Sequence, residues 1–81
     1  MYTKKQFASD LKKRVFEKES VKSIGIWTYL VYLDWGDTDD VSFIDLLLHL
    51  NTMELGPEFA LSYEKLNQIA DDLIAGKDVK L

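Results

Sequence analysis

The chain has 81 residues, of which 47% are hydrophobic and 30% charged, with a formal net charge of −4 and no cysteine. This length allows one domain, and the composition is typical of a folded globular protein and argues against a disordered one. The lack of cysteine excludes disulfides and thiolate metal sites, and it fits the reducing cytoplasm, where we expect the protein to reside.

The first residues lack the apolar run of a signal peptide, and the longest mainly apolar stretch is residues 24–33. That stretch is half of the roughly 20 residues that a membrane-spanning helix needs. We therefore expect a soluble protein without a membrane partner.

The charges are segregated along the chain. Residues 1–22 contain seven Lys or Arg against three acidic residues, whereas residues 23–64 contain eight Asp or Glu and no Lys or Arg. A surface of one sign steers association with a surface of the opposite sign, so this segregation bears on the choice of partner.

The first predicted helix spans residues 4–18. Thr3-Lys4-Lys5-Gln6 fits a capping box, in which the Thr3 side chain and the Gln6 side chain each satisfy a backbone amide. The apolar residues that follow recur at helical spacing on one face: Phe7, Ala8, Leu11 and Val15.

Residues 24–35 are ambiguous, because their aromatic and β-branched side chains favour a strand. A lone strand cannot satisfy its backbone hydrogen bonds, and the chain offers no convincing second strand. We therefore predict a helix in which Trp27, Leu30 and Val31 share one face. A short β-element paired across a dimer is the alternative.

Residues 36–40 are predicted to form a turn that leads into a helix over 39–55. Asp37 or Thr38 could cap this helix, and Asp39 and Asp40 in its first turn would suit the positive end of the helix dipole. Apolar residues then nearly encircle the axis, apart from one narrow polar stripe, which predicts a central, mostly buried helix. The stripe consists of Ser42, Asp45, His49 and Thr52.

Gly56-Pro57 ends this helix, and Ser62 caps a last helix over 62–75 that stops before Gly76. The tail, residues 77–81, is expected to fray. The sequence thus predicts an all-α protein, residues 1–81 forming a single helical domain, with a compact bundle of about four helices.

Catalysis and metal binding have little support in the sequence. Ser42, Asp45 and His49 could suggest a catalytic triad, but three residues along one straight helix face cannot converge on a substrate atom. The acidic run 34–40 fits no register of an EF-hand loop, and His49 with Asp45 is too few ligands for structural zinc. We expect no enzyme, no catalytic residue, no metal and no cofactor.

Nucleic acid is not an expected partner either. The four glycines are isolated, so no phosphate-binding loop is present. Lys5, Lys12, Lys13 and Arg14 of the first helix could contact phosphates, but a pI near 4.8 opposes such binding.

The most informative segment combines aromatic and acidic residues. Trp and Tyr are frequent interface anchors, and carboxylates beside them suit a basic protein surface. We expect Trp27 and one tyrosine to lie in the core. The predicted partner-binding residues are Tyr29, Tyr32, Asp34, Trp35, Asp37, Asp39, Asp40 and Asp45.

The layout of the chain resembles that of small acidic bacterial immunity proteins, the inhibitors of colicin-type and contact-dependent growth inhibition toxins. The similarity lies in the Lys-rich first helix from Phe7 to Phe16, the aromatic Trp27-Thr28-Tyr29, the Leu46-Leu47-Leu48 helix, and the segment 61–66. It implies a stoichiometric inhibitor that masks a basic toxin domain, such as a nuclease. The alternative is a structural or assembly module that forms a homodimer through its aromatic face, so both monomer and homodimer are expected states.

Overall fold

The computed structural model describes residues 2–35 and 39–81, and within these ranges it contains helices and no strand. The prediction of an all-α bundle is confirmed, and the β-alternative for the second segment is wrong because that segment is a continuous helix. The α-helices are α1 (Lys4–Phe16), α2 (Val21–Asp34), α3 (Val41–Asn51) and α4 (Tyr63–Ile74), with short 3-10 helices η1 (Thr52–Leu55) and η2 (Pro57–Phe59) between the last two.

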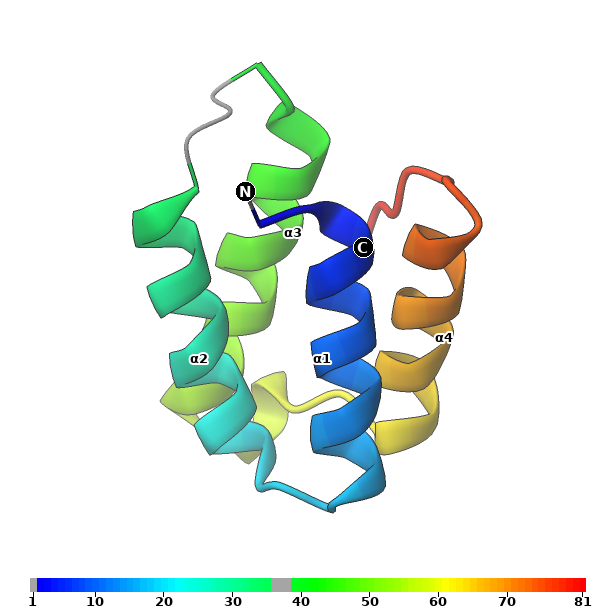
Figure 1. Ribbon diagram of the computed structural model, residues 1–81. Helices are drawn as coiled ribbons and strands as arrows, with labels where there is room; N and C mark the ends of the chain where they lie inside the picture. Colours follow the sequence, from blue (N-terminus) through cyan, green and yellow to red (C-terminus); the bar gives the residue numbers. More distant parts are fainter. Residues whose placement is uncertain (1, 36–38) are drawn as a thin grey trace.

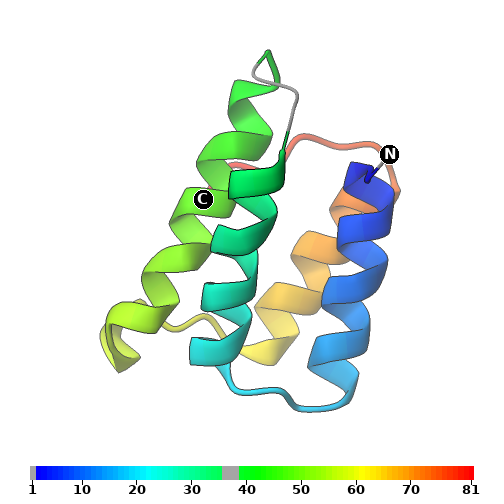
Figure 2. The same ribbon diagram turned by 60° about the vertical axis from the view of Figure 1, so that its left-hand side comes forward.

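The four helices alternate in direction, so that each runs antiparallel to the one before it (Figure 1). They form two layers, because α1 packs mainly on α4 while α2 packs mainly on α3 and η1. Figure 2 shows α2 at the outside of the bundle, with α3 on one side of it and α1 on the other. One side of α2 is therefore left without a covering helix.

Each of the four α-helices begins at a polar cap, as expected from the unsatisfied amides of a first turn. The Thr3–Gln6 capping box is confirmed, with both of its hydrogen bonds present. Ser62 caps α4 by accepting from the Lys65 amide. Ser20 likewise caps α2, which therefore begins three residues before the predicted start at residue 24.

The cap of α3 differs from the prediction. Asp40 is the N-cap and accepts a hydrogen bond from the Phe43 amide at 3.2 Å, so Asp39 and Asp40 precede the first turn and do not lie inside it. The predicted helix 39–55 is also too long, because the regular helix ends at Asn51 and η1 completes it. The predicted first helix, 4–18, ends early at Phe16, with Lys18 beyond it in the left-handed region at φ 56°.

The core is apolar and draws on all four helices. Phe7 is fully buried, with its ring stacked on Trp27 at 4.9 Å and edge-on to Phe43 at 5.3 Å between centroids. Trp27 and Tyr32 pack against this core, as expected for the tryptophan and one tyrosine. Val79 also packs on the core, so the expectation that the whole tail frays is wrong.

The burial of α3 is lower than predicted. Val41 is 61% exposed and Leu48 38% exposed, so α3 is not a buried helix with one narrow polar stripe. In α2, Leu30 is 56% exposed although the sequence pattern places it on one face with Trp27 and Val31. A helix in a two-layer bundle has neighbouring helices around only part of its circumference. Apolar residues on the remaining part of the helix stay exposed on the surface.

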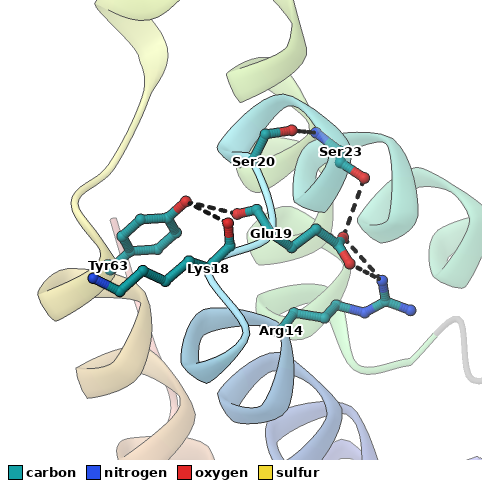
Figure 3. Close-up of polar contacts among 6 residues, drawn as sticks. All are labelled: Arg14, Lys18, Glu19, Ser20, Ser23 and Tyr63. Carbon is teal, nitrogen blue, oxygen red and sulfur yellow. Dashed lines mark hydrogen bonds and ion pairs between the residues drawn. The ribbon is translucent and has the colours of Figure 1, made fainter.

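A polar network joins the ends of three helices on the side where α1 ends (Figure 3). Arg14 donates from Nη1 to both carboxylate oxygens of Glu19 at 2.9 Å, and the Ser23 hydroxyl donates to the same carboxylate at 3.2 Å. The Tyr63 hydroxyl donates to the Glu19 carbonyl at 2.8 Å. Arg14 also lies over the Trp27 ring at 4.2 Å. This arginine therefore serves the packing of the bundle.

Candidate partner-binding surface

The predicted binding residues fall into separate places in the fold. Asp34 and Trp35 lie at the end of α2, and Asp39 and Asp40 lie just before α3. We call Asp34, Asp39 and Asp40 the acidic corner, because they flank the connection between these antiparallel helices. Asp37 was also predicted to bind, but it lies outside the described residues.

Within the acidic corner, Asp40 has a structural role. Its carboxylate caps α3 and also pairs with Lys4 of α1 at 2.8 Å. The hydrogen bond from Lys4 lowers the pKa of Asp40 below its usual range, and the Phe43 amide acts in the same direction. Asp40 thus links the start of α3 to α1. Asp34 and Asp39 are more exposed than Asp40, so their side chains are more accessible to a partner.

We predict that Asp40→Ala lowers the free energy of unfolding by about 1–2 kcal/mol at pH 7, the usual cost of losing a helix cap. Because the folded pKa is lowered, the charge contributes fully above the ordinary pKa of about 3.9, and this contribution is lost as the pH falls from there through the folded pKa. Urea unfolding of both proteins at pH 7 and pH 3 measures the difference. A difference that grows at pH 3 would contradict this account, and Asp34→Ala, at an exposed aspartate of the same corner, is the matched control.

The aromatic residues beside the acidic corner divide between core and surface. Trp35 packs on Phe43 with ring centroids 4.6 Å apart, and its Nε1 is buried without a hydrogen-bond partner among the described residues. Tyr32 is half-buried, while Tyr29 is 41% exposed and tilts against Tyr32 at 5.9 Å. Of these three predicted contact residues, Tyr29 presents the most accessible ring.

Asp45 lies apart from the others. With Ser42 and His49 it lines a shallow groove of about 260 Å³ between α3 and the tail residues 79–81. Ser42, Asp45 and His49 therefore face the tail, whereas α2 covers another side of α3. Within the described part of the chain, no hydrogen bond links the side chains of Ser42, Asp45 and His49.

Two further observations concern metals and membranes. In residues 2–35 and 39–81, no three His, Asp or Glu side chains gather closely enough to hold a metal ion. Across the same ranges, no helix combines the length and apolarity needed to cross a bilayer.

Sequence reasoning identified Tyr29 as a contact residue but missed the exposed aliphatic residues on the same side of α2. We call this surface the α2 stripe: Ile26, Tyr29, Leu30 and Leu33. Ile26 is 44% exposed, Leu30 56% and Leu33 59%. These positions recur at steps of three and four, so they line one side of the helix. The signal in the sequence is that apolar residues occupy nearly every side of α2, more than one packed face can bury.

The basic residues of α1 are largely engaged inside the molecule. Lys12 pairs with Asp71 of α4, Lys4 with Asp40, and Arg14 with Glu19. These contacts reduce the positive surface that α1 could offer to phosphates, and one of them brings the Lys4 ammonium group to Asp40 in the acidic corner.

No family model matches the sequence, and neither a curated protein nor a solved structure shows detectable similarity to it.

Proposed function

We propose that this protein is a non-enzymatic binding protein that docks a basic protein partner on the acidic corner and the adjoining end of α2. The functional class that fits best is a stoichiometric inhibitor of the immunity type, which masks a cationic surface such as that of a toxin nuclease. The observation that carries the proposal is that Asp34 and Asp39 are exposed at the two sides of the connection between α2 and α3, while Tyr29 and Leu33 are exposed along the last turns of α2.

Charge and shape act together in this proposal. The chain has no Lys or Arg between residues 23 and 64, so neither α2 beyond its first turn nor α3 supplies a cation to the acidic corner. Exposed carboxylates steer a basic partner towards the surface, and the neighbouring aromatic and apolar side chains provide the area that holds it. The charge of Asp40 is partly engaged within the fold, by the cap of α3 and by Lys4.

The experiment has two stages. The tagged protein is used to capture proteins from its native cells, and a captured candidate is then purified and tested for direct 1:1 binding. The association rate of that complex is compared between the wild type and the double variant Asp34→Lys/Asp39→Lys. We expect at least a tenfold slower association, with a weaker dependence on salt, because electrostatic steering changes association rates by about 10–1000-fold.

The control is Asp72→Lys/Glu64→Lys on α4, which changes the net charge equally but on another helix. Circular dichroism verifies that both variants remain helical. An association rate that falls equally in both variants would show a net-charge effect only, and a rate unchanged in both would contradict the proposed surface.

A further inference from the structure

The α2 stripe has no covering element in the described structure, although it contains three large aliphatic side chains. Its members lie on the outer side of α2, away from Ile24, Thr28 and Val31, which are buried against the bundle. In Figure 2 this helix is at the front, and no other helix crosses over it. Contiguous exposed apolar surface of this kind marks an interaction site more often than scattered apolar residues do.

The charges at the two ends of α2 indicate what covers the stripe. Lys22 lies in the first turn and Asp34 at the last residue, both are exposed, and neither forms an ion pair with another described residue. Helix dipoles favour acidic groups near the N-terminus and basic groups near the C-terminus. Both charges of α2 are therefore at the unfavourable end of their own helix.

A second copy of α2, running antiparallel to the first, would bring each of these two charges close to a helix end that favours it. Lys22 of one copy then lies beside Asp34 of the other copy, near the negative carboxyl-terminal end of that copy's helix dipole. The two-fold symmetry of the pair repeats this contact with the two copies exchanged. Ile26 and Leu30 are equally distant from the midpoint of this arrangement, so the two apolar centres face each other. A parallel pair would instead place like charges together.

We infer that two copies of this chain associate as an antiparallel dimer through α2, with the α2 stripe at its centre. A single helix face is smaller than the roughly 800 Å² per partner of standard interfaces, so the association is weak and depends on concentration. The dimer covers Asp34 and Leu33, which also belong to the proposed partner surface. Partner binding and self-association then exclude each other.

The test measures mass by sedimentation at protein concentrations from about 10 µM to 1 mM, the range in which weak complexes form. We expect the wild type to shift from monomer towards dimer, and Lys22→Glu and Asp34→Lys each to raise the dimer dissociation constant at least tenfold. An equimolar mixture of these two variants should associate again, because the reversed charge on each chain would then oppose a charge of the opposite sign on the other.

The mixture separates this proposal from other forms of self-association. Leu30→Glu should abolish the dimer, while Phe16→Glu should not, although Phe16 is 88% exposed on α1. A wild type that stays monomeric at 1 mM, a concentration at which even weak complexes form, would overturn the inference. A Leu30→Glu variant that still forms the dimer would also overturn it. The same holds if the mixture of Lys22→Glu and Asp34→Lys stays dissociated while circular dichroism shows that each variant is folded. The test uses this chain alone, so its outcome is independent of the proposed basic partner.

Discussion

Replacing Phe7 with alanine is expected to lower the free energy of unfolding by about 3–5 kcal/mol, the usual cost of removing a large buried aromatic side chain. The Phe7 side chain is fully buried between Trp27 of α2 and Phe43 of α3, so it joins α1 to both helices of the other layer. Its loss leaves a cavity at the contact between the layers and removes the stacking partner of Trp27.

This loss is large relative to the stability of so small a domain. At about 0.05–0.15 kcal/mol per residue, the free energy of unfolding of a chain of this length is itself only several kcal/mol. We therefore expect Phe7→Ala to unfold well below the wild-type urea midpoint, and to be partly unfolded at physiological temperature. Tryptophan fluorescence during urea titration measures it, since Trp27 lies directly on the substituted ring.

Phe16→Ala provides the matched control, because it removes the same side chain from α1 at a position that is 88% exposed. Its effect should stay within about 0.5 kcal/mol, as for surface substitutions in general. Equal losses in the two variants would mean that Phe7 does not join the two layers.

The parts of the fold that could be predicted from sequence are those determined by local chemistry. The capping box at Thr3 and the Ser62 cap each require only neighbouring residues, and α1 and α4 accordingly begin where expected. The Ser20 cap is harder to find because the apolar run that marks the helix in the sequence starts only at Ile24.

The cap of α3 could not be predicted from local chemistry alone. We predicted Asp37 or Thr38 as the cap, with Asp39 and Asp40 in the first turn, although all four side chains are of a type that suits an N-cap. The ion pair between Asp40 and Lys4 favours one of them, and Lys4 belongs to another helix. The choice among the four therefore depends on tertiary structure.

The candidate surface was harder to predict, because exposure depends on which neighbours a helix receives. An apolar residue such as Leu33 has the same sequence signal whether it is buried or, as here, 59% exposed. Asp45 is acidic and close in sequence to the acidic corner, so sequence reasoning places it there. In the structure, the side of α3 that carries Asp45 faces the tail. Only the tertiary arrangement separates these two acidic regions.

Gly25 lies where α2 approaches the backbone of α3 and η1 most closely. A Cβ atom at this position would lie 3.1 Å from the Glu54 amide nitrogen and 3.2 Å from the Leu50 carbonyl oxygen. Both are backbone atoms of the α3–η1 segment, which cannot turn aside as a flexible side chain can. Glycine thus allows the close approach of α2 to this segment.

We expect Gly25→Leu to lower the free energy of unfolding by about 3 kcal/mol or more, at the upper end of losses from overpacking. Leucine has a better helix propensity than glycine by about 1 kcal/mol, so an isolated helix would gain stability from the change. The loss must therefore come from the forced separation of α2 from α3. Urea unfolding measures it, and Gly25→Ala should give a smaller loss because only the Cβ atom must be accommodated.

Lys22→Leu is the control, since it adds a leucine to the exposed side of the same helix. It should change the free energy of unfolding by less than about 1 kcal/mol. If Gly25→Leu were as stable as this control, the helices could separate without cost at their closest point. The position of α2, and with it the α2 stripe and the end of α2 at the acidic corner, would then not be fixed by packing on α3.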